Sequence, residues 1–280
     1  MSFPRTTVAG VSLPRLLIGT NWMFGWSHTG NAADKFINEK HSSGEATIRI
    51  IEAFNSYGID AVMGPFSTHS DCYDKIKRAE DKIGKKIILI DTPNINVDDN
   101  EAARKEANVI IKKSAEIGSA FCLIHHSSCE QLVNRNKKTI ERIGDYTNMI
   151  REAGIIPGLS AHMPEIIQYS DMNNYDVETY IQIFNCMGFL MQVEVEPIIK
   201  IIHEAKKPVM TIKPMAAGRV TPYIGLTFNW SVLRPQDMIT VGCISEHEVH
   251  EDVEISLAAM ERRLPNLEGR SSPSKTSIIK

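Results

Sequence analysis

Four ionisable side chains stand where apolar runs of the sequence end. His125 follows AFCLI, Lys213 follows PVMTI, Asp91 ends KIILID, and His162 lies just beyond IIPGLS. Imidazole exchanges protons near neutral pH, and a carboxylate can orient it or take up a proton. We therefore expect His125 and His162 to act as acid and base. Asp91 would orient them or accept a proton.

Lys213 is placed where the carbonyl or phosphate of a substrate would lie. A lysine at such a position can form a Schiff base, hold a substrate oxygen by its charge, or pair with Asp91. All three roles are open at this point. Because Pro214 restricts the residue before it, we expect extended backbone geometry at Lys213 and a cation that points into the site.

A metal site is an alternative use of the same positions. Asp91, His125 and His162 would be the ligands of a divalent cation with one open position. The sequence has neither H-x-H nor H-E-x-x-H, so metal binding has no motif to support it. Successive residues of a strand point to opposite faces, so His126 is expected to face a helix layer and to be structural.

Substrate contacts are expected from residues that follow other apolar runs. The candidates are Asn21, Trp22, His28 and Asn185. Residues 22–28, WMFGWSH, gather three aromatic side chains, which could form a hydrophobic wall over a ligand or plug the end of the fold. Residues 29–43 have no clear periodicity and exceed the usual loop length, which favours a lid.

A phosphate site is a further expectation, from the segments KPMAAGR and VGCIS. Small residues beside an arginine allow the backbone to approach a phosphate closely, and a helix amino terminus adds free amides. The candidate residues are Gly218, Arg219 and Gly242.

These residues are positioned by a unit that recurs eight times: an apolar run, a polar loop and an amphipathic stretch. Strands are predicted over residues 15–21, 59–64, 86–91, 120–125, 155–160, 179–184, 208–213 and 239–243. Helices between them include 45–57, 70–83, 102–117, 130–152 and 194–205. Continuous apolar strands joined by helices form parallel sheets that are buried on both faces. The sequence therefore predicts an α/β protein with a single (β/α)8 TIM barrel, and an open doubly wound sheet is the alternative. We expect the barrel over residues 1–268 and a flexible C-terminal tail over 269–280.

The composition limits the partners. The chain has 280 residues and a net charge of −3, so it offers no basic field for nucleic acid or for an anionic membrane surface. No run approaches the ~20 apolar residues of a membrane span. The five cysteines include no C-x-x-C pair, which favours reduced thiols and a cytoplasmic protein. A small-molecule substrate is expected, and the sequence leaves open whether the chain forms a homo-oligomer.

The carboxyl half, residues 158–260, resembles the aldo-keto reductase superfamily of (β/α)8 barrels. The matching stretches are GLSAHMP, TYIQIFN, KKPVMTIKPMAAGRV and DMITVGCISEHEVHEDVEIS, in the family's order and spacing. The resemblance implies NADPH binding without a Rossmann domain and a tetrad of Asp, Tyr, Lys and His. Only the histidine carries over, as His125. Met63 stands where the family has its aspartate, and Asp91 stands where it has its lysine.

The resemblance therefore supports the fold more than carbonyl reduction. The whole chain looks closer to a less characterised, aldo-keto reductase-like branch that opens with a motif such as GTNWMFGWSH and has AAGR after its seventh strand. We expect an enzyme that acts on a small polar substrate, whether sugar-like, carbonyl or phosphorylated, by acid–base chemistry of the lyase, isomerase or hydrolase type. The alternatives are a divergent NAD(P)H-dependent oxidoreductase and a non-catalytic small-molecule-binding barrel. A divalent metal or NAD(P) is the cofactor to consider, and no motif selects either.

Overall fold

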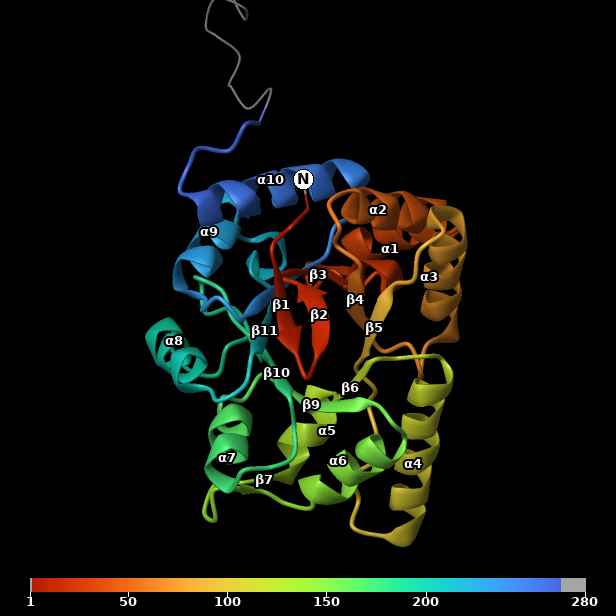
Figure 1. The fold of residues 1–280 in the computed structure, drawn as a ribbon, viewed down its shortest axis with the longest axis vertical. Coiled ribbons are helices and arrows are strands. Elements are labelled where there is room, and N and C mark those ends of the chain that lie inside the picture. Colours follow the sequence, from red (N-terminus) through yellow and green to blue (C-terminus); the bar gives the residue numbers. More distant parts are fainter. Residues whose placement is uncertain (1, 268–280) are drawn as a thin grey trace, which may run out of the picture.

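Eight parallel strands close into a barrel in the computed structural model, which describes residues 2–267 (Figure 1). The strands in barrel order are β3 (Leu16–Gly19), β4 (Ala61–Gly64), β5 (Ile88–Asp91), β6 (Phe121–Ile124), β9 (Ile156–Ala161), β10 (Thr179–Ile183), β11 (Val209–Ile212) and β12 (Met238–Val241). β12 pairs with β3, which closes the ring. The predicted (β/α)8 barrel is confirmed, and the open sheet is excluded. The expected limit of the barrel at residue 268 and the tail over 269–280 lie outside the described residues.

Helices surround the barrel and connect its strands. They are α1 (Asn31–His41), α2 (Glu45–Ser56), α3 (Ser70–Ile83), α4 (Glu101–Glu116), α5 (His126–Cys129), α6 (Ile143–Glu152), α7 (Glu165–Asn173), α8 (Val195–Glu204), α9 (Pro222–Val232) and α10 (Glu246–Glu261). Short 3-10 turns are η1 (Asn21–Phe24), η2 (Glu130–Leu132) and η3 (Ala216–Gly218). Within residues 2–267, no helix combines the length and apolar character that crossing a membrane requires.

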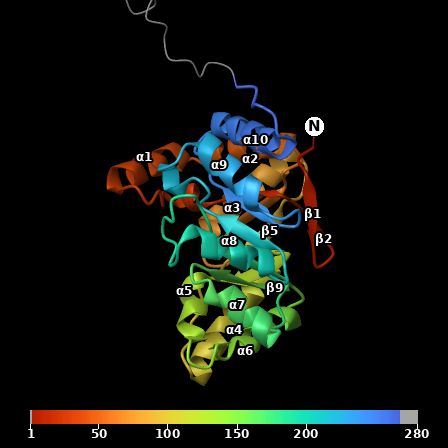
Figure 2. The same cartoon turned by 90° about the vertical axis from the view of Figure 1, so that its left-hand side faces the viewer.

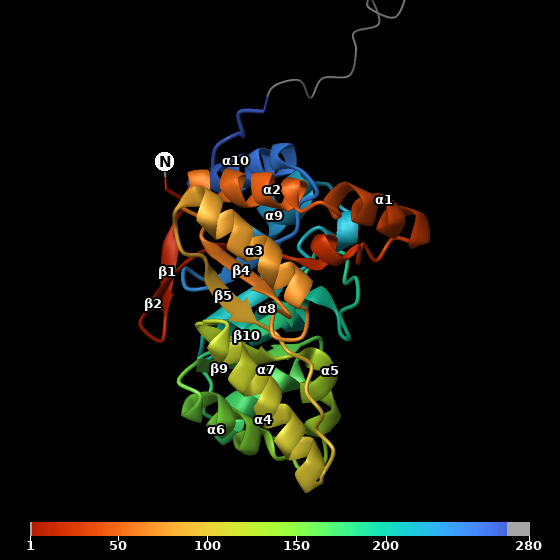
Figure 3. The ribbon, with the colours of Figure 1, turned by 90° about the vertical axis from the view of Figure 1, so that its right-hand side faces the viewer.

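Two sequence expectations about the connections are wrong. The helix predicted over 130–152 is interrupted by a hairpin of β7 (Val133–Asn134) and β8 (Thr139–Ile140), and only α6 remains helical. Lys138 and Arg142 adopt left-handed backbone angles there, with φ of 54° and 57°, which end a helix. The segment 29–43, expected to lack periodic structure, contains α1. Figures 2 and 3 show that α1 projects from the body of the molecule on the side opposite the β1–β2 hairpin.

That hairpin, β1 (Arg5–Val8) and β2 (Val11–Pro14), closes the amino end of the barrel. Val8 and Leu13 pack against interior side chains, among them Phe121 and Met238 at the starts of β6 and β12. The other interior residues of this cluster are Leu17, Ala61, Met63, Ile90, Leu123, Ile181 and Met210. Apolar packing therefore fills the barrel from its amino end, and the polar side chains gather at the carboxyl end.

Candidate active site at the barrel mouth

His125 follows β6 and caps the helix α5. Its Nδ1 accepts a hydrogen bond from the backbone N–H of Ser127 at 3.4 Å and lies 2.7 Å from the Ser127 hydroxyl. Because Nδ1 is the acceptor for the amide, the ring proton belongs on Nε2. Burial, and then the neighbouring His126, lower the pKa of the ring to about 4. His125 is therefore a neutral imidazole whose Nε2–H can donate to a substrate oxygen.

His126 lies at the mouth and not in the helix layer, so the expectation for this residue is wrong. The strand ends at Ile124, so the alternation of strand residues does not extend to His126, which begins α5. Its ring centroid lies 4.1 Å from that of His125, and its ring stacks on His162 at 4.0 Å with an interplanar angle of 18°. These three imidazoles form one group, which we call the histidine stack.

Glu130 contacts both His126 and the backbone of the loop after β9. Its Oε1 accepts hydrogen bonds from the backbone N–H groups of His162 at 2.6 Å and Met163 at 2.9 Å. Its Oε2 lies 3.9 Å from His126 Nδ1. Burial favours the protonated acid, but the neighbouring His126 and the hydrogen bonds from the His162 and Met163 N–H groups outweigh it and lower the pKa of Glu130. For His162, burial and then His126 lower the pKa to about 4.

Lys213 reaches the same region from the end of β11. Its Nζ donates a hydrogen bond to His28 Nε2 at 2.9 Å. Its charge also lowers the pKa values of both His125 and His162. Burial lowers the pKa of Lys213 itself to about 8.

The backbone at Lys213 differs from the expectation based on Pro214. Its φ is 58°, in the left-handed region that non-glycine residues rarely adopt, and Ala216 and Ala217 follow with φ of 49° and 55°. The Lys213 carbonyl accepts a hydrogen bond from the Ala216 N–H at 2.9 Å, so a tight turn sets this geometry against the preference of the residue before a proline. The strained turn brings the ammonium to His28.

The loop after β3 is tied to the loop after β11 through His28. Asn21 Nδ2 lies 3.4 Å from His28 Nε2, and Arg219 donates to the His28 carbonyl oxygen at 3.1 Å. The Arg219 guanidinium also lies 4.0 Å above the centre of the Phe189 ring. Asn21, His28 and Arg219 thus form the polar rim beside Lys213.

Aromatic residues of the same loop form an exposed platform. Phe24 and Trp26 stack with centroids 4.5 Å apart, and the edge of His69 contacts both rings. Trp26 is 43% exposed. Trp22, expected to bind substrate, is instead 5% exposed, and its Nε1 donates to the Gly19 carbonyl at 2.6 Å.

Asp91 and Asn185 do not join the site. The side chain of Ile90, on β5, points into the barrel, so the next side chain, Asp91, points toward the helices. There it lies near Ser114 of α4 and accepts a hydrogen bond from the Ser67 N–H at 3.2 Å. It is fully buried, and burial raises its pKa. Asp91 therefore does not reach the barrel mouth, where it was expected to act as an acid, a metal ligand or the partner of Lys213.

Asn185 is also fully buried, with its side chain bound to its own loop. Its Oδ1 accepts from the N–H groups of Met187 and Phe189, at 3.2 and 2.9 Å, and its Nδ2 donates to the Phe189 carbonyl at 3.0 Å. These bonds occupy the groups that were expected to meet a substrate.

The expected phosphate residues have structural tasks in this fold. A Cβ at position 242 would lie 2.8 Å from the Trp22 ring, so Gly242 makes room for that side chain. At the start of α10, Glu248 Oε2 accepts from the Ile244 N–H at 2.7 Å, and Ser245 Oγ accepts from the Glu248 N–H at 3.4 Å. This capping box uses amides that a phosphate would need and adds negative charge. Phosphate binding by Gly218, Arg219 and Gly242 stays a prediction.

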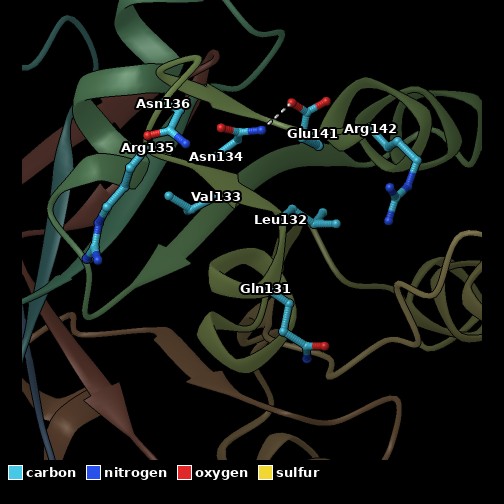
Figure 4. Close-up of a pocket in the computed structure, with 8 residues that line it drawn as sticks. All are labelled: Gln131, Leu132, Val133, Asn134, Arg135, Asn136, Glu141 and Arg142. Atoms are coloured by element: carbon cyan, nitrogen blue, oxygen red, sulfur yellow. Dashed lines mark hydrogen bonds between the residues drawn. The ribbon is translucent and has the colours of Figure 1, made fainter.

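A cavity of about 470 Å³ lies along the β7–β8 hairpin, and none of the site residues described above lines it (Figure 4). It is lined by Gln131, Leu132, Val133, Asn134, Arg135, Asn136, Glu141 and Arg142. Several of its polar groups already have partners: Asn134 Nδ2 donates to Glu141 Oε1 at 3.2 Å, and Arg142 donates to the Val97 carbonyl at 2.8 Å. The titratable groups that could do chemistry lie at the mouth, so we place the candidate site there.

Glu130 and His126 are the site residues that sequence reasoning missed. Their separation of four residues would have placed them on one face of a helical turn, but the predicted helix started at residue 130 and the predicted strand ended at residue 125. Because the predicted boundary fell between His126 and Glu130, the two residues were not recognised as neighbours.

Comparisons with solved structures show the same barrel in other proteins. A Pseudomonas aeruginosa protein assigned as an aldo-keto reductase has a TM-score of 0.65 and 12% identity, over 91% of this chain and 96% of that chain. Aldose reductase from Giardia lamblia has a TM-score of 0.53 and 12% identity, over 95% of this chain and 90% of that chain. Orotidine 5'-monophosphate decarboxylase from Methanocaldococcus jannaschii has a TM-score of 0.53 and 13% identity, over 87% and 98%. No protein-family model and no curated protein matches the sequence. The aldo-keto reductase-like barrel predicted from the sequence is thus confirmed as a fold, and the reaction has to be argued from the residues.

Proposed function

We propose that this chain is an enzyme that acts on a small polar substrate, bearing a carbonyl or hydroxyl oxygen, by acid–base chemistry of the lyase, isomerase or hydrolase type. The observation that carries the proposal is the hydrogen bond from the Ser127 N–H to His125 Nδ1, together with the Lys213 cation, whose charge acts on the same ring. It makes His125 Nε2 a donor. A neutral donor and a nearby ammonium stabilise negative charge that develops on an oxygen during proton transfer from a neighbouring carbon.

The remaining role is that of the proton acceptor, which we assign to His162. Within residues 2–267, its ring nitrogens have no hydrogen-bond partner, while its ring is held against His126. A free imidazole nitrogen next to the oxygen-binding pair can take a proton from the substrate and return it at another atom. Asn21 and His28 at the rim would orient the polar end of the substrate.

The divergent oxidoreductase has less support from the residues. Met63 packs inside the barrel where the resembled family has its aspartate, and Asp91 faces the helix layer where that family has its lysine. No tyrosine replaces them in the sequence just after residue 63. Without that acid and its partners, a hydride acceptor would have to be protonated by His125 or Lys213.

Solvent proton exchange tests the proposal directly. The protein is incubated in D₂O with a panel of aldoses, ketoses, their phosphates and short hydroxy-ketones, and deuterium incorporation is followed by NMR. We expect exchange at a carbon next to an oxygen-bearing carbon for one substrate class, slowed about 10²–10⁴-fold in His125→Ala. The exposed His247, on α10, provides the control His247→Ala, which should keep the wild-type rate.

Two results would overturn the assignment. One is equal exchange rates in His125→Ala, His162→Ala and wild type. The other is oxidation of NADPH with the same panel without any deuterium exchange, which would favour the oxidoreductase.

A further inference from the structure

Two residues of the histidine stack, His126 and His162, lie close to Glu130, and the proposed acid–base chemistry gives no role to His126 or Glu130. One ligand atom from each of His126, Glu130 and His162 lies within 4.8 Å of the other two. Ligand atoms around a tetrahedral cation at about 2.0–2.2 Å are separated by roughly 3.5 Å. Bringing all three onto one ion therefore requires movements of the order of 1 Å, together with a rotation of the His126 and His162 rings out of their stacked arrangement, so that one nitrogen of each points to the ion.

The backbone holds this cluster in place. His126 and Glu130 are four residues apart across α5 and η2, with His126 Nδ1 and Glu130 Oε2 3.9 Å apart. The N–H groups of His162 and Met163 bind Glu130 Oε1 at 2.6 and 2.9 Å and leave Oε2 directed to His126. Hydrogen bonds that fix the far side of a ligand are the usual support of a metal site. All three cluster residues are partly exposed, so an ion can reach them.

We propose that His126, Glu130 and His162 bind a divalent transition-metal cation, with at least one coordination position left for water or substrate. Two imidazoles and one carboxylate suit Zn²⁺, Co²⁺ and Fe²⁺, whereas Mg²⁺ and Ca²⁺ prefer oxygen ligands throughout. The sequence-based metal set of Asp91, His125 and His162 is replaced by a different set, because Asp91 faces α4.

The inference goes beyond the proposed function and does not depend on it. As a metal ligand, His162 would not act as the proton acceptor, and a bound cation would supply Lewis-acid chemistry for a substrate oxygen or a water. Binding can be measured whether or not a substrate is known.

Metal titration of the full chain tests the inference. Protein dialysed against chelator is titrated with Co²⁺, whose visible absorption reports the ligand field, and the complex is then displaced with Zn²⁺. We expect one equivalent of saturable binding with visible bands typical of four or five ligands. Glu130→Gln keeps an oxygen that can accept from the two N–H groups, so the loop should stay folded while affinity falls.

The size of the loss distinguishes a ligand from a neighbour. Removing a group that only hydrogen-bonds to a metal ligand commonly costs about 10–100-fold in metal affinity, so Glu130→Gln and His126→Gln should each cost at least about 100-fold. The control His247→Gln removes an exposed histidine on α10 and should bind as wild type. Circular dichroism checks that the variants are folded.

The inference is overturned if the wild-type protein shows no saturable binding at one equivalent. It is equally overturned if folded Glu130→Gln and His126→Gln bind Co²⁺ with the affinity of His247→Gln. Failure of the proposed reaction would instead appear in the deuterium exchange assay and leave these titrations unchanged.

Discussion

Lys213 Nζ donates a hydrogen bond to His28 Nε2 over 2.9 Å and so connects the loop after β11 to the loop after β3. These loops are far apart in the sequence and meet only because β12 is the single strand between β11 and β3 in the closed barrel. The lysine ammonium lowers the pKa values of two imidazoles at the same end of the barrel, His125 and His162. No carboxylate is hydrogen-bonded or ion-paired to Lys213 within residues 2–267, so its charge is available to a ligand.

The substitution Lys213→Met should therefore reduce turnover or substrate binding without unfolding the protein. We expect a loss of about ten- to a thousandfold, at roughly 1.4 kcal/mol for each factor of ten. The melting temperature should stay the same or rise, because methionine fills a partly buried position without the cost of a desolvated charge. Lys200→Met on α8, where the lysine is exposed, is the control. A large fall in melting temperature with unchanged ligand affinity would contradict the ligand-binding role and leave a structural one.

The titration of Lys213 gives a pH dependence with a definite sign. Burial lowers its pKa in the folded protein to about 8, below the ordinary value of 10.5. Binding of an anionic or carbonyl substrate should then weaken as the pH rises through about 8, because the ammonium is lost. In Lys213→Arg the guanidinium stays charged, so the same decline should be absent up to pH 10. Affinities measured from pH 6 to 10 check this, and identical profiles for the two proteins would exclude Lys213 as the titrating group.

The same shift affects stability in the opposite direction. Between about pH 8 and 10.5 the unfolded chain holds a proton at Lys213 that the folded chain has lost, so the free energy of unfolding should rise with pH across this window. The rise should be missing from Lys213→Met. Urea unfolding at pH 7.5, 8.5 and 9.5, with the difference between the two proteins taken at each pH, measures it.

The pattern of apolar residues shows where a buried strand lies, but it does not show which face of the sheet each of its side chains takes. Apolar runs located all eight barrel strands, and the residues after them brought His125, His162 and Lys213 to the mouth. The run IILID could not show which face Asp91 takes, because a strand covered on both sides is apolar at every position and has no visible alternation. His126 and Glu130 depend on where β6 ends and α5 begins, and that boundary is set by tertiary packing.

A buried acid on α10 gives a second pH-dependent prediction. Asp252 is 2% exposed, and the Cys243 Sγ–H donates to its Oδ2 at 3.5 Å. Burial raises the pKa of Asp252 from 3.8 to about 7. Between these two values the folded chain holds a proton that the unfolded chain has lost, so the free energy of unfolding should fall as the pH rises from about 4 to 7.

Asp252→Asn removes this titration and keeps the shape of the side chain. We expect the variant to be more stable than wild type at pH 8, by up to about 4 kcal/mol from a shift of roughly three pH units, and to lose that advantage near pH 4. Denaturant unfolding at both pH values checks the prediction. Glu106→Gln, at an exposed position on α4, is the control. A constant difference between Asp252→Asn and wild type at the two pH values would show that Asp252 does not titrate in this range.

The final prediction concerns Gly158, which lies inside the barrel on the strand that carries His162. A Cβ at this position would lie 2.6 Å from Leu123 Cγ and 2.8 Å from the Thr179 carbonyl oxygen. The second contact is with backbone of β10, which pairs with β9 and cannot move alone. Gly158→Ala should therefore cost about 1–3 kcal/mol of stability by overpacking. Because β9 must shift to relieve the contact, the Glu130 bonds to His162 and Met163 should weaken, and Co²⁺ affinity should fall together with the melting temperature.

Gly144→Ala on α6 is the matched control, since nothing lies within 4 Å of its added Cβ and alanine favours a helix, so it should be neutral or more stable. A Gly158→Ala protein as stable as Gly144→Ala would mean that β9 and β10 can separate freely, which would contradict the rigid positioning of His162 on which both proposals depend.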